Sequence, residues 1–262
     1  MNIYERPIGF FDSGVGGISV LREAVKLMPN ENYIYFGDSK NAPYGTKSVK
    51  EIKKLSFDVV DFLIKKDIKA LVVACNTATS AVIDELRLKY SNIPVIGIEP
   101  ALKPAVEMNR EGNIIIMATP VTLSEKKFNK LMKKYEKEVN IKLLPCPGLV
   151  ELIEMGFTRG DKINNYLKKK LGKHLNSDIA AIVLGCTHYP FVKYEIEEVI
   201  GVSIPILDGG IGTAKQLKRQ IEIHNIKNKS YKKGKVQIFN SLEDKKIIKL
   251  SYDLLTARFC NE

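Results

Sequence analysis

Short apolar runs alternate with helical patterns along most of the chain, and this alternation restricts the possible fold more than any other feature of the sequence. The runs are rich in Ile, Val and Phe, and the segments between them repeat apolar residues with the period of a helix. Strands that alternate with helices in this way form parallel sheets with helices on both faces. The sequence therefore predicts the α/β class, with sheets that are mostly parallel.

The pattern also gives approximate bounds for the elements. The expected strands are Ile8–Phe11, Tyr33–Phe36, Ala70–Ala74, Val95–Ile98, Ile114–Met117, Ala181–Leu184, Ile204–Leu207 and Val236–Phe239. The expected helices are Ile18–Leu27, Val49–Lys65, Ser80–Lys89, Ser124–Glu138, Lys162–Leu175 and Thr213–His224. Each helix is expected to carry the chain across one face of a sheet, because parallel neighbours need a crossover connection.

The chain contains a faint internal repeat. Cys75 in "LVVACNTATS" and Cys186 in "AIVLGCTHYP" each follow a strand-like run and one small residue. Each cysteine is followed, at the same interval, by a proline that opens another strand-like run. The segments 7–28 and 113–134 also read alike, as strand, loop and helix. Chance likeness between short strand–turn–helix phrases is one explanation, and duplication of a folding unit is the other.

A duplicated unit predicts two pseudo-symmetric α/β lobes. We expect residues 1–97 and 208–262 to form the first lobe and residues 98–207 to form the second. Ligands of open parallel sheets bind beyond the carboxyl ends of the strands. Two lobes that face each other would therefore place both cysteines on opposite walls of one cleft, and this cleft is the expected active site.

The composition excludes several classes of protein. The chain has 262 residues and a formal net charge of +11, but its lysines lie in helical patterns mixed with Glu and Asp, as on solvated helix surfaces. Nucleic acid is therefore not the expected partner, although a positive surface would attract a small anion. No apolar run reaches the length of a membrane span, and no signal peptide is apparent. Four cysteines without such a signal indicate free thiols and a cytoplasmic location.

Two loops are rich in turn-forming residues. "FFDSGVGGISVL" at residues 10–21 is a glycine-rich turn between a strand and a helix, and its glycines allow close approach of the backbone. It lacks the G-x-G-x-x-G dinucleotide pattern, so a purely structural turn is the alternative. "DSKNAPYGTKS" at residues 38–48 offers a tyrosine, a glycine and a threonine. By itself this second loop is weak evidence of a site.

The two cysteines admit several interpretations. A cysteine after a buried strand is often only a small apolar residue. Metal binding fits poorly, because the chain has no C-x-x-C pair and its three histidines are widely spaced. A hydrolase would use one thiol as nucleophile and leave the other idle. Two thiols that face each other across a cleft suit a reaction on both faces of one carbon, which is inversion of a stereocentre.

Four phrases together resemble the glutamate racemase family. They are "FFDSGVGGISVL", "GDSKNAPYGTKS", "VVACNTATS" and "VLGCTHYP", and they stand in the family's order between residues 10 and 190. The likeness continues through "IPILDGG" and the helix that follows. The departures are mild: Gly209 stands where a Ser or Pro is expected, and "CPGLVELIEMG" is a loose version of its segment.

The resemblance implies two α/β lobes and a two-base mechanism without a cofactor or metal, with Cys75 and Cys186 as the acid and base. It implies that Cys186 takes the proton of L-glutamate and Cys75 that of D-glutamate. It also implies that the thiols are assisted by Asp12, Glu154 and His188. The residues that it places around the substrate are Asp12, Ser13, Tyr44, Gly45, Asn76, Thr77, Thr187 and His188. It implies that the D-glutamate supplies peptidoglycan synthesis, and we expect a homodimer.

The chemistry of thiols agrees with these roles. A free thiol has a pKa of about 8.5, so a cysteine that removes a proton near neutral pH needs help. His188 is two residues from Cys186, and Asp12 is expected on the side of Cys75. Cys146 and Cys260 lack this context and are expected to be inert. The sequence leaves open an aspartate racemase, a cysteine hydrolase that acts on an amide or cyclic imide, and an inactive binding protein.

Overall fold

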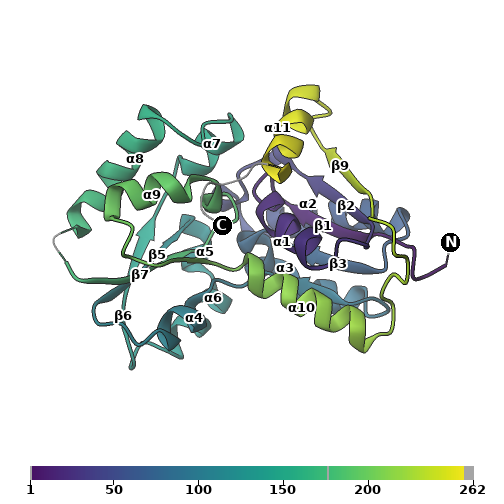
Figure 1. Cartoon of the computed structure of the whole chain (residues 1–262), viewed down its shortest axis with the longest axis horizontal. Coiled ribbons are helices and arrows are strands. Elements are labelled where there is room, and N and C mark those ends of the chain that lie inside the picture. The colour runs from purple at the N-terminus through teal and green to yellow at the C-terminus, as the bar shows by residue number, and fades with distance from the viewer. Residues whose placement is uncertain (1, 176, 257–262) are drawn as a thin grey trace.

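The computed structural model describes residues 2–175 and 177–256, which form two lobes that lie side by side (Figure 1). The first lobe contains a five-stranded sheet and the second a four-stranded sheet, and all the strand pairs of both are parallel. Helices cover both faces of each sheet. The predicted α/β class and the two parallel-sheet lobes are therefore confirmed.

The two sheets share one strand order. The sheet of the first lobe runs β4-β3-β1-β2-β9, and that of the second runs β6-β5-β7-β8. The strands are β1 Ile8–Asp12, β2 Tyr33–Gly37, β3 Ala70–Val73, β4 Val95–Gly97, β5 Asn113–Ala118, β6 Asn140–Pro145, β7 Ile179–Leu184, β8 Ile206–Asp208 and β9 Val236–Asn240. Strands β5 to β8 thus repeat the places of β1 to β4, and β9 is an addition to the first lobe.

Helices connect these strands. The α-helices are α1 Ile18–Leu27, α2 Val49–Lys65, α3 Asn76–Lys89, α4 Leu102–Glu107, α5 Pro120–Ser124, α6 Lys126–Lys133, α7 Leu149–Glu154, α8 Asp161–Leu171, α9 Lys193–Ile200, α10 Gly210–Ile223 and α11 Lys245–Thr256. Short 3-10 turns occur at Ser39–Asn41, Tyr44–Thr46, Gly172–His174 and Tyr189–Val192. Among the described residues, no helix has the length and apolar character that a membrane crossing requires.

The central strands are buried on both faces, which explains their continuous apolar sequences. In β1, Ile8 and Phe10 pack with α1, α10 and α11, whereas Phe11 packs on the other face with α2 and α3. Side chains alternate between the faces of a strand, so a strand covered on both sides needs apolar residues at every position. The second lobe repeats this arrangement, with α7, α8 and α9 on one face of its sheet and α4 and α6 on the other.

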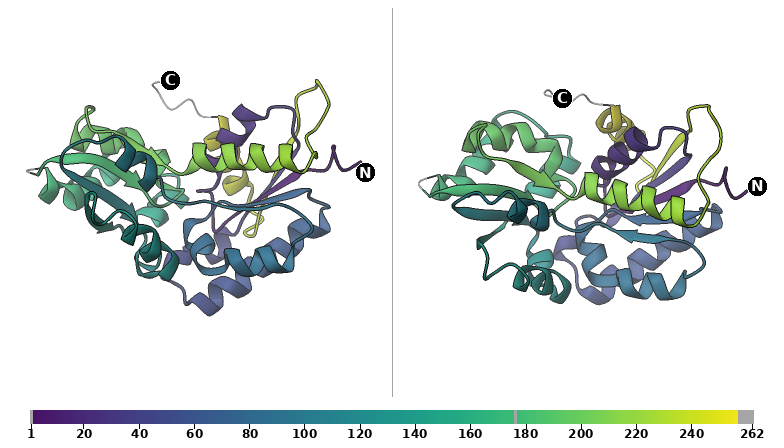
Figure 2. Two further views of the ribbon diagram at one scale, coloured as in Figure 1. Left: turned by 90° about the horizontal axis from the view of Figure 1, so that it is seen from below. Right: turned by 60° about the horizontal axis from the view of Figure 1, so that its bottom comes forward.

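One cluster of apolar side chains continues from one lobe into the other. It includes Ile8 and Phe10 of β1 and also Ile115 and Met117 of β5. The chain enters the second lobe after β4 and returns after β8, and α10 then lies against α1 along the first lobe (Figure 2). These crossings lie near the predicted lobe limits, residues 1–97 with 208–262 and residues 98–207, which stay a prediction.

The structure differs from the predicted elements in two main places. The expected helix at 124–138 is the shorter α6, Lys126–Lys133, because Glu125 is extended and separates it from α5, which ends at Ser124. Strand β6 was not predicted, because it is an edge strand whose side chains are mostly exposed and whose sequence, "NIKLLP", has no apolar run. The short helices α4, α7 and α9 and the helix α11 were also not predicted.

Candidate active site

The two cysteines occupy equivalent positions. Cys75 follows β3 and caps the N-terminus of α3, where its sulfur accepts a hydrogen bond from the backbone N–H of Ala78 at 3.4 Å. Cys186 follows β7 after Gly185, and a Cβ at Gly185 would lie 3.0 Å from the Cβ of Ala118. Because β3 and β7 hold the same place in their sheets, both thiols lie at the carboxyl edge of a central strand.

A relay of three side chains leads away from Cys186 in the second lobe. The sulfur of Cys186 is 3.7 Å from Nδ1 of His188, and Nε2 of His188 is 2.6 Å from Oε1 of Glu154. Glu154 ends α7, and His188 stands just before the 3-10 turn at Tyr189–Val192. Cys186 and His188 are buried, and Glu154 is nearly so. A doubly protonated His188 would therefore present its Nδ1–H to the sulfur of Cys186 and its Nε2–H to the carboxylate of Glu154.

The first lobe holds the other end of this relay. The backbone N–H of Val15 donates to Oε1 of Glu154 at 2.6 Å, and the hydroxyl of Ser39 donates to Oε2 at 2.9 Å. Both oxygens of this second-lobe carboxylate are thus bound by groups of the first lobe. The relay beside Cys186 is complete only when the two lobes are together.

The surroundings of Cys75 are different. Its sulfur lies 3.5 Å from the hydroxyl of Ser13, which follows β1. Asp12 is fully buried, and its carboxylate accepts hydrogen bonds from the N–H of Gly14 at 2.9 Å and from the hydroxyl of Thr187 at 3.1 Å. In the described contacts Ser13, rather than Asp12, is the direct partner of Cys75. Asp12 connects the first lobe to the loop that carries Cys186.

The glycine-rich turn makes room for the relay. A Cβ at Gly14 would collide with the carboxylate of Glu154, and a Cβ at Gly16 would collide with the imidazole of His188. Both glycines have negative φ values or values outside the left-handed region, so space rather than backbone strain excludes a side chain. The turn therefore lets side chains of the second lobe approach the backbone of the first.

Further predicted site residues are buried, and some of them contact the other lobe. The hydroxyl of Thr77 lies 3.2 Å from that of Thr119 and 3.0 Å from that of Thr122, across the boundary between the lobes. The buried side-chain oxygen of Asn76 has no hydrogen-bond partner in the described structure. Tyr44 is buried and donates to Asp38 at 2.7 Å. Gly45 is also buried, with Thr119 against the place that its Cβ would occupy.

Burial and charge shift the pKa values of Cys75, His188, Glu154 and Asp12. Burial raises the pKa of Cys75 to about 12, and the charges of Asp12 and Cys186 add to the rise. Burial lowers the pKa of His188, but hydrogen bonds and charge from Cys186 and Glu154 outweigh it and raise this pKa well above its ordinary value. Burial raises the pKa of Glu154, but contacts with His188 and the first lobe lower it overall. Burial also raises the pKa of Asp12, although His188 opposes this.

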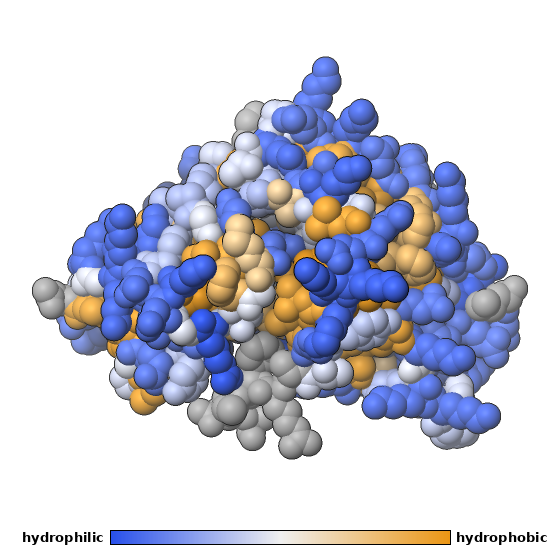
Figure 3. Space-filling view, turned by 90° about the horizontal axis from the view of Figure 1, so that it is seen from above, coloured by the Kyte–Doolittle hydropathy of each residue, from blue (hydrophilic) through white to orange (hydrophobic). Residues whose placement is uncertain are grey.

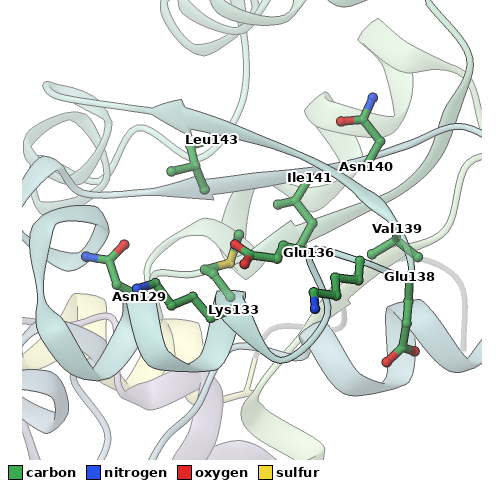
Figure 4. A pocket seen from close by; sticks show the side chains of 10 residues that line it. Asn129, Lys133, Glu136, Glu138, Val139, Asn140, Ile141 and Leu143 are labelled. Atoms are coloured by element: carbon green, nitrogen blue, oxygen red, sulfur yellow. The ribbon is translucent and has the colours of Figure 1, made fainter.

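Among the described residues, the predicted site residues belong to no metal-ligand cluster and line neither of two large surface cavities. In the part of the chain that the structure describes, no group of three or more His, Cys, Asp or Glu residues is placed to hold a metal ion. A cavity of about 840 Å³ lies between α6 and β6, with Asn129, Lys133 and Glu136 around it (Figure 4). Another, of about 930 Å³, lies beside β4, β8 and α10. None of the predicted site residues lines either cavity.

The structure brings the predicted site residues together from both lobes. The sequence did not indicate several further polar residues that hold them. These are Ser19, Asp38, Ser39, Thr119, Thr122 and Asn240. Asp38 and Ser39 lie in the loop at 38–48, whose turn-forming residues already indicated a possible site in the sequence. Asn240 had none. Of the two cysteines expected to be inert, Cys146 is buried, and Cys260 lies outside the described residues.

Comparison with known proteins places the chain among racemases. The family model of Asp/Glu/Hydantoin racemases matches residues 14–217. The chain belongs to this family. The glutamate racemase of Clostridium acetobutylicum is 64% identical to it over 255 residues, which are 97% of this chain and 99% of the relative. The protein is thus a racemase, and therefore an isomerase.

Solved structures agree with this membership. The glutamate racemase of Francisella tularensis, in complex with D-glutamate, matches with a TM-score of 0.83 and 28% identity, over 98% of this chain and 96% of that one. The Escherichia coli glutamate racemase, in complex with L-glutamate and the activator UDP-MurNAc-Ala, matches with a TM-score of 0.76 and 33% identity, over 83% of each chain. The racemase therefore shares the fold of enzymes that hold either enantiomer of glutamate.

Proposed function

We propose that this racemase interconverts L- and D-glutamate, with Cys75 and Cys186 as acid and base on opposite faces of Cα. The observation that carries the proposal is the equivalence of the two thiols, which follow β3 and β7 at the same place in two sheets of the same strand order. Glutamate is the substrate favoured by the Clostridium relative and by the structures that contain D- and L-glutamate.

The reaction of L-glutamate begins at Cys186. Its thiolate, beside the imidazolium of His188, takes the proton from Cα, and the thiol of Cys75 then donates a proton to the opposite face. The raised pKa of Cys75 suits this step, because a thiol that stays protonated at neutral pH is ready to act as an acid. The products are D-glutamate, a protonated Cys186 and a thiolate at Cys75.

The reaction of D-glutamate uses the same groups in reverse order. Cys75 must then be the thiolate. The N–H of Ala78 already donates to its sulfur, and the hydroxyl of Ser13, which accepts from the thiol, can turn to donate to the thiolate. Cys75 also stands at the N-terminus of α3, where the helix dipole favours negative charge. Asp12 lies close enough to influence the pKa of Cys75, and we propose that it assists on this side, through its contacts with the substrate.

The remaining polar groups bind the substrate. Asn76 and Thr77 begin α3, and Thr187 follows Cys186, so their side chains surround the space between the sulfurs. Carboxylates of glutamate are expected to accept hydrogen bonds from these hydroxyl and amide groups. Such donors also stabilise the charge that develops when Cα loses its proton. Ser13, Tyr44, Gly45 and His188 complete the proposed binding site.

Racemisation in heavy water tests the function directly. Protein stripped of pyridoxal phosphate and treated with a chelator is given L-glutamate alone, and optical rotation is followed. We expect D-glutamate with deuterium at Cα, because the acid thiol exchanges its proton with solvent. Loss of activity on stripping would contradict a cofactor-independent reaction. Turnover of aspartate instead of glutamate would favour an aspartate racemase. Covalent trapping at one cysteine, with the other cysteine replaceable, would favour a cysteine hydrolase.

The cellular role follows from the product. We propose that the racemase is a cytoplasmic homodimer and that its D-glutamate supplies peptidoglycan synthesis. The E. coli relative, whose activator UDP-MurNAc-Ala contains a cell-wall sugar, supports the second part. Depletion of the protein should lower the D-glutamate content of the wall, and added D-glutamate should restore it. Sedimentation velocity of the purified protein measures the oligomeric state.

A further inference from the structure

Strand β9 has no counterpart in the second lobe, and it ends beside the active site. It pairs with β2 at the edge of the five-stranded sheet, with Asn240 opposite Gly37 (Figure 1). Among the residues that the structure describes, the sheet of the second lobe has only the four repeated strands. Any contact that β9 makes with the site therefore acts on one side of an otherwise symmetric arrangement.

Asn240 makes such a contact through Ser39. Its side-chain nitrogen donates to the hydroxyl oxygen of Ser39 at 2.8 Å, and that hydroxyl donates to Oε2 of Glu154 at 2.9 Å. A hydroxyl has one proton to donate, so a donor on its oxygen directs that proton to the carboxylate. Asn240 thus fixes the direction of the hydrogen bond that Ser39 gives to Glu154.

The orientation of the Asn240 amide is itself fixed. Its side-chain oxygen accepts the backbone N–H of Leu242 at 3.0 Å, which leaves the nitrogen facing Ser39. The backbone N–H of Ser241 donates to the carbonyl of Gly37 at 3.0 Å and holds this turn against β2. Asn240 is 6% exposed, so water does not readily replace its hydrogen bonds.

We propose that Asn240 and Ser39 are positioning residues for the proton relay of Cys186. They hold the carboxylate of Glu154 in the direction that lets its other oxygen bind His188, which in turn faces the sulfur of Cys186. No equivalent chain leads to Cys75, whose described partners are Ser13 and Ala78. The proposal rests on the proposed two-thiol racemisation, and it predicts that disturbing β9 affects the step at Cys186 in particular.

Kinetics of Asn240→Ala and Ser39→Ala test the proposal. Ser39→Ala removes a hydrogen bond to a charged group and should lower kcat about tenfold, with KM changed less than about twofold. Asn240→Ala removes a hydrogen bond to the Ser39 hydroxyl and should lower kcat by up to the same factor. The primary isotope effect with Cα-deuterated L-glutamate should rise, because abstraction by Cys186 becomes more rate-limiting. The isotope effect with D-glutamate should fall, because reprotonation by Cys186 then limits the reverse reaction. The acid limb of the pH profile should move to higher pH, because Ser39 helps to keep the pKa of Glu154 low.

Ser241→Ala is the matched control. The Ser241 hydroxyl accepts the N–H of Lys40 at 3.0 Å, so it joins the same two segments without contacting Glu154. It should leave the isotope effects unchanged. The double variant Asn240→Ala/Ser39→Ala should be no slower than Ser39→Ala alone, because Asn240 acts through Ser39.

Three results would overturn the proposal: unchanged isotope effects in both single variants, the same shifts in Ser241→Ala, or losses that multiply in the double variant. Failure of the proposed function itself is distinguishable, because the unaltered protein would then not racemise glutamate.

Discussion

Cys75 and Cys186 occupy equivalent positions but have different electrostatic surroundings. Cys186 faces a histidine that is held by a carboxylate, whereas Cys75 faces a hydroxyl group and the N-terminus of a helix. Burial keeps Cys75 protonated at neutral pH, and its pKa is about 12. A two-base racemase needs one thiol charged and one neutral. We propose that the different partners of the two thiols supply this difference, although their backbone positions are nearly symmetric.

Replacement of either thiol should remove most racemisation. Cys75→Ser and Cys186→Ser should each lower kcat by about 10²–10⁴-fold, because serine is a much weaker acid and base than cysteine in these roles. Optical rotation with each enantiomer measures the loss. Cys146→Ser is the matched control, because Cys146 is buried in the second lobe and its sulfur bonds the carbonyl of Leu144. Turnover like that of the unaltered protein in either of the first two variants would contradict the symmetric mechanism.

The charged state of His188 gives a prediction about pH. Because Glu154 and Cys186 raise the pKa of His188, its stabilising contribution is fully present below the ordinary value of 6.5 and is lost as pH rises through the raised value. The lowered pKa of Glu154 means that its contribution is present above the ordinary 4.5 and is lost as pH falls through the lowered value. Glu154→Gln should therefore lower the pKa of His188. It should also lower the free energy of unfolding, chiefly at pH values above the ordinary pKa of Glu154 and below the raised pKa of His188.

Histidine ring resonances measure this effect. The chain has three histidines, so His174→Gln and His224→Gln variants assign the signals. The pKa of His174 is lowered by burial, which separates it from His188. An unchanged titration of His188 in Glu154→Gln would show that the carboxylate does not hold the charge on this ring.

The residues that we propose to carry the chemistry form a recognisable pattern in the sequence, and the residues that contact them do not. Cysteines after apolar runs, with Asn, Thr and His beside them, form a local pattern. The contacts of Ser39 and Asn240 depend on chain segments about 200 residues apart, in contact only because β9 pairs with β2. A single serine or asparagine in a turn has an ordinary local explanation, so no local signal identified either residue.

The glycine-rich turn between β1 and α1 determines how closely the lobes approach. Gly16→Ala should push the imidazole of His188 away, because the added methyl group collides with the ring. A displaced catalytic group can lower kcat by about 10²-fold, even when the fold is retained. Thermal unfolding checks the fold and racemisation checks the site.

Gly212→Ala in α10 is the control for this variant. No atom lies within 4 Å of the Cβ that it adds, and alanine favours a helix over glycine by about 0.5–1 kcal/mol. It should leave activity unchanged and raise stability slightly. Equal activity in the two alanine variants would mean that the turn tolerates a side chain.

Elements with strong periodicity were predicted well, and those at sheet edges were not. Strands β1, β2, β3, β5 and β7 are buried and their bounds agree with the expected runs within two residues. Helix α3 begins at Asn76, whereas the sequence predicted its start at Ser80. The first turn was missed because it carries polar residues of the site instead of apolar ones. Strand β6 has an exposed, polar sequence. The internal repeat nevertheless indicated a strand at this place, because β2 follows α1 and β6 follows α6, the equivalent helix of the second lobe.

At the scale of the whole molecule, the two lobes together bury both thiols. Cys75 is 5% and Cys186 8% exposed. Hydrogen bonds from Val15 and Ser39 to Glu154, and between Thr187 and Asp12, join the lobes. The surface beyond is mostly hydrophilic, with apolar side chains gathered toward the middle of the face seen in Figure 3. We predict that substrate entry requires the lobes to separate and these hydrogen bonds to break.

Ser19 provides a test of this opening, because it joins the lobes without belonging to the proposed chemistry. It lies on α1 and is buried. Its hydroxyl is 2.8 Å from the carbonyl oxygen of Gly16 in its own lobe and 2.9 Å from that of Thr187 in the second lobe. Removal of one such hydrogen bond by Ser19→Ala should favour the open state about two- to tenfold. Alkylation of Cys75 by iodoacetamide should accelerate by the same factor, since the open population limits the reaction.

Two controls separate opening from general loosening. Ser56→Ala removes another buried serine hydroxyl, on α2 within the first lobe, whose oxygen has no hydrogen-bond partner in the described structure. It should not change the alkylation of Cys75. Alkylation of Cys146, which is buried within the second lobe, is measured in the same experiment. Its rate reports whether the second lobe itself has become less rigid. If Ser19→Ala accelerates Cys146 as much as Cys75, or neither thiol at all, the lobes do not open by breaking this contact, and glutamate must reach the thiols by another route.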